Sequence, residues 1–327
     1  MSILDVTCRD MNVVHGDKLP RRVCCVALAV FALSILGCVY LWRCASMTTE
    51  HINLEWLMLK KQLAWNGIGL ALAMLLPVAG WRRILKSTPF ALAGWLVLLV
   101  VGCFCPHGNG SLRVPLGIVQ LDVMACSPIV GVMFAAWLVD LLARKFNVRA
   151  CMVVCVAIVG MVALGAAMMM TSVSVCVHQD ADARSQHRLN AQQTCVEAFN
   201  AAYWFSANID AFGHAKLPVR YAFAMPPNTA LIFGKWFPAS VAVLFGLFAF
   251  ALVCCWRKAK SEAVKALVFF SGSVMLIPAT LGFCGCVGLT PWLYVGVPLV
   301  SFGGAAVVSS WLLVGALVAA EMQKEVE

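Results

Sequence analysis

Long runs of apolar residues alternate with short polar segments along most of this 327-residue chain. Each run is close to the ~20 residues that a helix needs to cross a ~30 Å hydrocarbon core, where only helices and closed barrels satisfy their backbone. The alternating ~10-residue segments of a membrane β-barrel are not found. The pattern predicts an all-α, polytopic transmembrane helical bundle that forms a single membrane domain over residues 1–327. We expect about eight spans, near residues 23–42, 63–80, 89–105, 118–142, 150–176, 232–256, 263–287 and 292–320.

Composition strengthens this interpretation. Hydrophobic residues make up 62% of the chain and charged residues only 12%, about half the charged fraction of an ordinary soluble domain. Mean hydropathy is +0.89. The first apolar run follows a mostly polar stretch and has no small-residue cleavage site, so we expect a retained helix rather than a signal peptide.

The distribution of lysine and arginine predicts the orientation, because basic residues favour cytoplasmic loops. With the N-terminus inside, the inner segments contain the clusters Arg21–Arg22, Arg82–Lys86, Arg144–Arg149 and Arg257–Lys265. Both termini are then cytoplasmic, and residues 177–231 form one long external loop. The net charge of +9 reflects this topology, so no nucleic-acid partner is expected.

The sixteen cysteines suggest little chemistry. Most lie inside the expected spans, where cysteine acts as a small apolar residue. Two Cys-x-Cys pairs begin at Cys103 and Cys284, but no histidine accompanies them at metal-site spacing, so no metal site is expected. Sequence cannot pair a disulfide on the outer face, which would involve Cys105, Cys176 or Cys195.

The most specific stretch lies near the C-terminus. It combines Gly288, Pro291, Pro298, Ser301, Gly303 and Gly304. Proline and glycine at membrane depth predict an interrupted helix, which is tolerated only where the backbone is buried in protein or lines a cavity. The alternative is a kinked last helix whose small residues allow close packing.

This stretch resembles the signature of the SEDS family (shape, elongation, division and sporulation), the group of RodA and FtsW. Residues 288–305 align with that signature without a gap, and Phe302 stands where the family has tyrosine. Five weaker similarities lie upstream of this signature and occur in the same order as in the family: residues 60–65, 109–113, 118–122, 179–183 and 226–234. The resemblance covers about residues 43–142 and 150–320.

The chain also departs from the family. It has no Asp-Leu-Gly-Thr motif and is one pair of spans shorter. The position of the external-loop aspartate to which the family's catalysis is attributed is Ala230. A Gly-Gly pair of the same loop corresponds to Ala201 and Ala202.

The resemblance implies a multi-pass protein of the bacterial plasma membrane that serves peptidoglycan synthesis in cell elongation or division. The family's activity is polymerisation of lipid II by glycosyl transfer, alongside a class B penicillin-binding protein. Lipid II, that protein and membrane lipid are the expected partners. No cofactor is expected, although a catalytic form could use a divalent cation. Two alternatives remain: a catalytically degenerate paralogue acting as a scaffold, and a precursor transporter, for which no inverted repeat is detected.

Glycosyl transfer from a pyrophosphate lipid needs cations for the phosphates and a carboxylate base for the attacking hydroxyl. The candidates for substrate binding are Arg113, Gln120, Asp122, Arg184 and Arg188. Asp122 lies near the outer end of its expected span, where a carboxylate is costly unless it is solvated or partnered. Ala230 cannot act as a base, and Asp210 and Glu197 are the candidate surrogates in the same loop.

Overall fold

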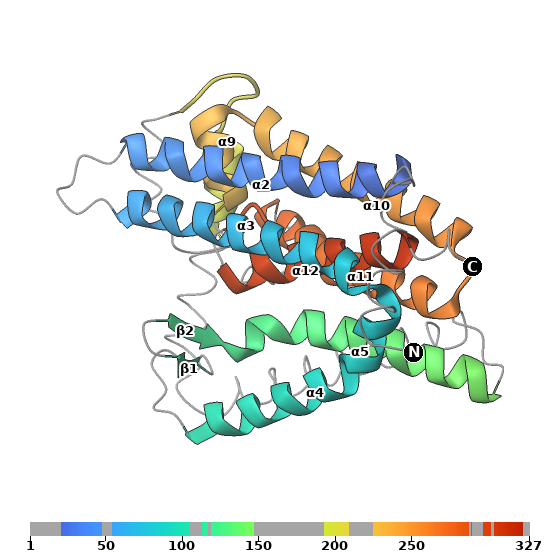
Figure 1. The fold of residues 1–327 in the computed structure, drawn as a ribbon. Coiled ribbons are helices and arrows are strands. Elements are labelled where there is room, and N and C mark those ends of the chain that lie inside the picture. The colour runs from blue at the N-terminus through green and yellow to red at the C-terminus, as the bar shows by residue number, and fades with distance from the viewer. Residues whose placement is uncertain are drawn as a thin grey trace, which may run out of the picture.

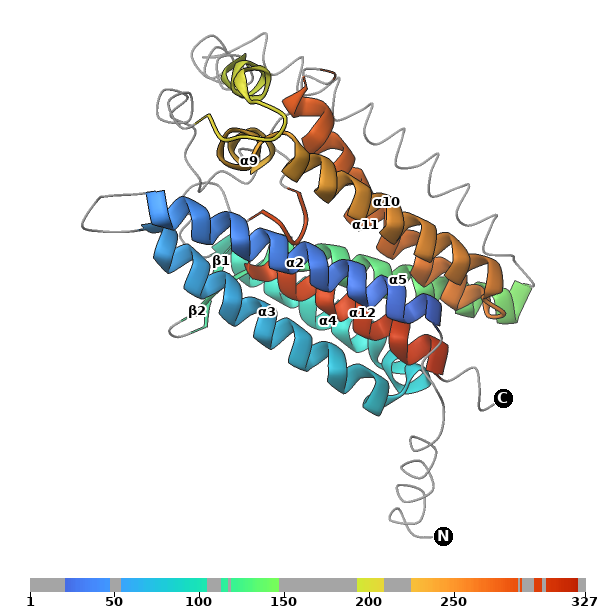
Figure 2. The same cartoon turned by 90° about the horizontal axis from the view of Figure 1, so that it is seen from above.

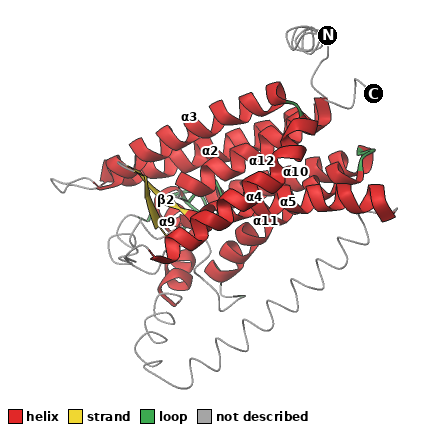
Figure 3. Ribbon diagram, turned by 60° about the horizontal axis from the view of Figure 1, so that its bottom comes forward, coloured by secondary structure: helices red, strands yellow, loops and turns green. Residues whose placement is uncertain are grey.

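A computed structural model describes residues 21–47, 54–104, 113–116, 119–146, 193–208, 225–287, 289, 297–301 and 304–322. Helices dominate this part of the chain, with one small hairpin (Figures 1 and 3). The elements are α2 (Arg21–Met47), α3 (Leu54–Ala79), α4 (Trp81–Phe104), β1 (Arg113–Leu116), β2 (Val119–Asp122), α5 (Val123–Phe146), α9 (Met225–Phe233), α10 (Trp236–Lys258), α11 (Glu262–Cys286) and α12 (Gly304–Met322). Residues 193–201 form a further short helix.

Five of the described helices, α2, α3, α4, α10 and α11, are long and apolar enough to cross a membrane. The apolar part of α12, Ala306–Met322, is shorter. The expected span at 150–176 and most of the expected loop at 177–231 lie outside the described residues. Within that loop, the structure describes the 193–201 helix and the whole of α9.

A single glycine joins α3 to α4. Gly80 has a φ of +80°, a left-handed conformation that glycine adopts without the steric penalty of a Cβ atom. Its amide donates to the carbonyls of Leu76 and Pro77 at 3.2 Å. The two helices can therefore reverse direction within one residue, and the chain returns towards the end from which α3 came (Figure 1).

The described helices α2, α4 and α11 run in one direction along the bundle and α3, α5, α10 and α12 run in the other, which sorts charge between the two ends of the bundle. We call the end at which α2 begins and α12 finishes the basic end, because most of the described lysines and arginines lie there. It carries Arg21, Arg22, Arg82, Arg83, Lys86, Arg144, Lys145, Arg257, Lys258, Lys260 and Lys265. The opposite end, which we call the hairpin end, has fewer basic residues in the described part of the chain: Arg43, Lys60, Lys61, Arg113 and Lys235.

α12 lies at the centre of the bundle and packs against α2, α3, α4, α5 and α11 (Figure 2). Its closest neighbour is α3, and glycine makes the approach possible. A Cβ at Gly315 would lie 2.6 Å from the carbonyl oxygen of Ala73, and one at Gly69 would lie 2.8 Å from the indole of Trp311. Small residues at a helix contact allow backbones to approach closely, so these two glycines determine how α3 and α12 pack.

The expected span at 118–142 begins differently in the structure. Residues 119–122 form β2, and the helix runs from Val123 to Phe146. β2 pairs with β1 in an antiparallel hairpin in which Arg113 lies opposite Asp122. The physical reason is visible in residues 119–122, where apolar and polar side chains alternate with the period of two that favours a strand.

Candidate functional site

The hairpin end holds a short chain segment against the start of α10. Residues 193–208 contact the end of α9 through main-chain hydrogen bonds. The amide of Asn208 donates to the carbonyl of Leu231 at 2.7 Å, and the amide of Lys235 donates to that of Tyr203 at 2.8 Å. These bonds hold residues 203–208 in place although most of their side chains are exposed.

Gly234, which lies between α9 and α10, allows residues 203–208 to approach this closely. Its φ is +98°, and a Cβ there would lie 2.6 Å from the carbonyl oxygen of Trp204. Both the left-handed backbone and the contact require glycine at this position. The main chain of residue 204 therefore passes directly over the junction, where it also accepts from the amide of Trp236 at 3.1 Å.

Ala230 is fully buried beneath this segment, with 0% of its surface exposed. It lies in a small apolar cluster with Leu231, Ala198 and Ala202, and Phe199 packs against the cluster. The 193–201 helix thus covers Ala230, the position at which the sequence resemblance predicts the family's acid. The side chain there is a methyl group, and the surrounding side chains are apolar as well.

Glu197, one of the two candidate surrogate bases, lies on the outer face of the same helix. Its side chain is exposed, and Oε1 accepts a hydrogen bond from Nε2 of Gln193 at 2.8 Å. The buried face of that helix presents Ala198 to Ala230 instead. Glu197 therefore lies on the exposed face of the helix whose buried face covers Ala230.

Buried polar groups occur immediately before Ala230 in α9. Asn228 is 0% exposed, and its Nδ2 donates to the hydroxyl of Tyr40 on α2 at 3.3 Å. The Thr229 hydroxyl donates to the carbonyl of Pro226 at 2.9 Å. The bond from Asn228 ties α9 to α2, which fixes the depth at which α9 sits in the bundle.

A second buried polar group lies where the chain enters α12. Residues 297–301 form a turn that is buried apart from Pro298, which is half-buried, and Leu299 has a φ of +67°. Left-handed φ is uncommon outside glycine and costs energy for a branched side chain. Gln62 on α3 supports the turn, since its Nε2 donates to the carbonyl of Leu299 at 3.3 Å.

Two further contacts support the same turn. A Cβ at Gly37 on α2 would lie 2.7 Å from the Leu299 carbonyl oxygen, so α2 packs directly on the turn. The Ser301 hydroxyl accepts from the amide of Val297 at 2.9 Å. For the described residues, the turn agrees with the expected interruption before the last helix, and α12 begins at Gly304.

The structure separates the sequence-derived candidates. Arg113 and Asp122 lie opposite each other on the hairpin, and Gln120 pairs with Pro115 two positions along. Pro298, Ser301 and Gly304 lie at the entry to α12. The candidates Arg184, Arg188, Asp210, Gly288, Pro291 and Gly303 fall outside the described residues.

The sequence pattern did not predict Asn228, Tyr40 or Gln62 as site residues. All three are buried polar side chains on otherwise apolar helices. A polar residue within an apolar helix at membrane depth is a signal for a functional or packing contact, and that signal was present in the sequence. The direction in which each side chain points, and hence its partner, was not.

Cys195 lies on the buried face of the 193–201 helix and is 0% exposed. Burial raises the pKa of this thiol from 9.0 to about 12, because a thiolate is poorly solvated in an apolar environment. Among the described residues, no group of three or more His, Cys, Asp and Glu side chains has an arrangement that could hold a metal ion.

No protein-family model matches the sequence, and no curated protein matches it either. Solved structures do match its fold. A chain from a structure reported as "Structural coordination of polymerization and crosslinking by a peptidoglycan synthase complex" aligns with a TM-score of 0.66 and 16% identity over 92% of this chain and 98% of that one. The Thermus thermophilus rod shape determining protein RodA aligns with a TM-score of 0.56 and 18% identity, over 90% of this chain and 95% of RodA.

A single-residue variant of the same RodA gives the same TM-score and identity over 96% of its length. At these identities the likeness concerns the fold. The chain therefore has the SEDS-like, polytopic helical fold that its motifs predicted, and it is a multi-pass membrane protein.

Proposed function

We propose that this protein serves peptidoglycan synthesis in the bacterial plasma membrane, where it binds lipid-linked precursor and a class B penicillin-binding protein without polymerising the precursor itself. Two similarities support the membrane role: the RodA-like fold over nine-tenths of the chain, and the likeness to a chain of a peptidoglycan synthase complex. In this proposal the basic end faces the cytoplasm, as the positive-inside rule favours.

The burial of Ala230 is the observation that argues against polymerase activity. General acid–base assistance is typically worth ~10²–10⁴ in rate, and a methyl group can neither accept nor donate a proton. Ala198 and Ala202 cover this position, and Glu197 lies on the outer face. A protein with this site would retain precursor binding through its basic residues while turning the precursor over slowly or not at all.

The hairpin favours one competing assignment, an active polymerase with Asp122 as its carboxylate. The strand register places Asp122 directly opposite Arg113, so an acidic and a basic residue occupy paired positions of the hairpin. A base beside a phosphate-binding cation is the combination that glycosyl transfer from a pyrophosphate lipid needs.

One assay separates the two assignments. Purified protein, alone and with a class B penicillin-binding protein, is incubated with labelled lipid II, and glycan strands are resolved by gel. A RodA complex with its own partner serves as the positive control. We expect lipid II binding without strand synthesis. Strand synthesis that is lost in Asp122→Asn would instead establish the polymerase, and absence of both binding and synthesis would refute the role with lipid II.

A further inference from the structure

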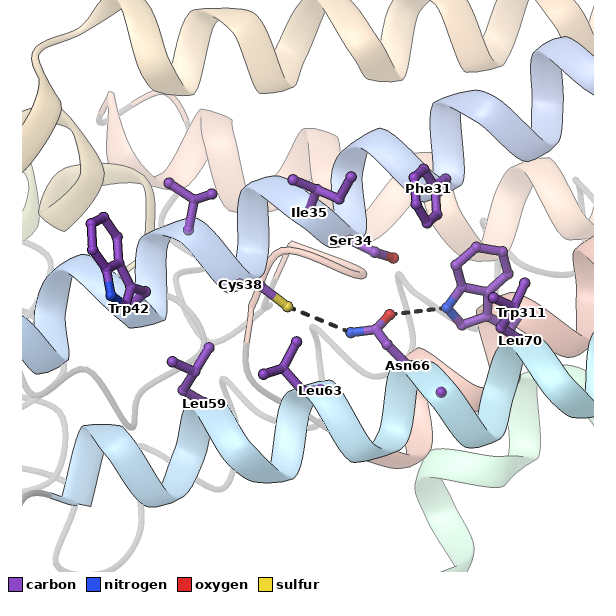
Figure 4. A pocket seen from close by; sticks show the side chains of 12 residues that line it. Phe31, Ser34, Ile35, Cys38, Trp42, Leu59, Leu63, Asn66, Leu70 and Trp311 are labelled. Carbon is purple, nitrogen blue, oxygen red and sulfur yellow. Dashed lines mark hydrogen bonds between the residues drawn. The ribbon is translucent and has the colours of Figure 1, made fainter.

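A groove of about 430 Å³ runs between α2 and α3 on the outward side of the bundle (Figure 4). Its walls are almost entirely apolar. From α2 they include Phe31, Ile35 and Trp42, and from α3 they include Leu59, Leu63 and Leu70. Phe31, Ile35, Trp42 and Leu63 are about half exposed, so the groove opens towards the surroundings of the bundle rather than into its core.

Contacts with α12 fix the inner wall of the groove. Asn66 on α3 accepts a hydrogen bond from Nε1 of Trp311 at 3.0 Å (Figure 4). Its Nδ2 donates to the carbonyl of Gln62 at 3.0 Å. The Cβ position of Gly69 meets Trp311 as well. The groove is therefore a preformed feature of the way α3 packs on α12.

One position on the groove wall leaves space that the described chain does not fill. Gly67 lines the groove, and no described atom lies within 4 Å of the position where its Cβ would be. An open apolar groove on a membrane protein is occupied by something apolar, because apolar surface facing water is unfavourable.

The dimensions of the groove match one leaflet of a bilayer. Phe31 to Trp42 and Leu59 to Leu70 each cover 11 helical steps, a length of about 16 Å at 1.5 Å per residue. Half of a ~30 Å hydrocarbon core is about 15 Å. These values suit an acyl chain, whereas a polyisoprenyl carrier chain is several times longer.

Charge at the hairpin end of the groove indicates the headgroup. Lys60 is exposed and directly follows the groove residue Leu59 in the sequence of α3. Arg43 directly follows the groove residue Trp42 in the sequence of α2. Trp42, near the end of α2, and Trp56, near the start of α3, are 51% and 40% exposed, which is typical of side chains at the headgroup boundary. A phosphate at this level would meet two cations from two different helices.

We propose that the α2–α3 groove binds one anionic glycerophospholipid, with an acyl chain along the apolar walls and the phosphate between Lys60 and Arg43. This site is distinct from the Ala230 region and goes beyond the proposed role in peptidoglycan synthesis. It assigns the two cations to a membrane lipid, whose binding stabilises the pairing of α2 with α3.

The test uses the full-length protein in nanodiscs of phosphatidylglycerol and phosphatidylcholine with identical acyl chains. Lipid that stays bound after transfer to detergent is identified by native mass spectrometry. We expect one retained phosphatidylglycerol. Gly67→Phe, which fills the groove, should reduce this adduct by about tenfold. Gly94→Phe is the matched control, because Gly94 on α4 also has open space around its Cβ.

The charge variants test the headgroup separately. Lys60→Gln and Arg43→Gln should each weaken the preference for phosphatidylglycerol by about fivefold, the size expected for one basic side chain near an anionic lipid. Lys86→Gln at the basic end should leave it unchanged. The proposal is overturned if Gly67→Phe and Gly94→Phe retain equal lipid, if the double charge variant keeps the preference, or if undecaprenyl phosphate displaces phosphatidylglycerol at equal concentration.

Discussion

Arg22 and Glu321 form an ion pair between the first and last described helices, with Nη2 of Arg22 2.6 Å from Oε2 of Glu321. The two residues are 299 positions apart in the sequence. The glutamate side chain is 1% exposed, whereas 22% of the arginine side chain is exposed. The pair joins α2 to α12 at the basic end, where both helices reach the boundary of the bundle.

Removing the arginine should destabilise the fold, because it breaks an ion pair whose carboxylate is buried. For Arg22→Met we expect a loss of about 3 kcal/mol, measured by unfolding in mixed micelles with increasing SDS. The control is Arg144→Met, which breaks the pair with Asp140, where 71% of the arginine side chain is exposed. Exposed pairs contribute about 0–1 kcal/mol, so equal losses in the two variants would contradict the prediction.

Introducing a carboxylate at Ala230 should not create an active site. In Ala230→Asp the new side chain would lie among Ala198, Ala202 and Leu231, where a buried polar group without a partner costs at least about 2 kcal/mol. We expect a lower unfolding midpoint and no gain of strand synthesis from lipid II. Ala201→Asp, on the exposed side of the same helix, is the matched control and should unfold like the parent. A stable, active Ala230→Asp would show that the 193–201 helix moves aside.

The turn before α12 should depend on the Ser301 hydroxyl. Ser301→Ala leaves the buried amide of Val297 without its 2.9 Å acceptor, at a cost of about 1–3 kcal/mol. Ser240→Ala is the matched control, since that exposed hydroxyl donates to the carbonyl of Trp236 within its own helix. We expect its effect to stay within about 0.5 kcal/mol. Thermal unfolding of both variants in the same detergent compares them directly.

Cys195 should react slowly with alkylating reagents at pH 8, because the thiolate is the reactive species and burial raises the pKa of this thiol to about 12. A raised pKa also means that the associated stability is complete below pH 9 and is lost as the pH rises towards 12. The comparison is a cysteine introduced by Glu197→Cys on the exposed face. Peptide-level mass spectrometry should give a rate at least ~100-fold lower for Cys195, and similar rates would contradict its burial.

Several features of this protein were readable in the sequence alone. The long apolar runs predicted the membrane helices, since the cost of burying backbone in lipid acts on each segment separately. The C-terminal residues 288–305 indicated the SEDS-like fold, which the comparison with solved structures confirms. The alanine at position 230, where the resemblance predicts an acid, was also readable in the sequence, because it concerns the identity of one residue.

Tertiary structure decided what those residues contact. Hydropathy does not reveal that Glu321 meets Arg22, that Gln62 supports the turn at Leu299, or that the 193–201 helix covers Ala230. Hydropathy also missed the hairpin that pairs Arg113 with Asp122. Insertion into a membrane depends on the composition of each segment, whereas these contacts depend on how helices distant in sequence pack. The close approach of α3 to α12 at Gly69 and Gly315, beside the open α2–α3 groove, exists only in the folded bundle.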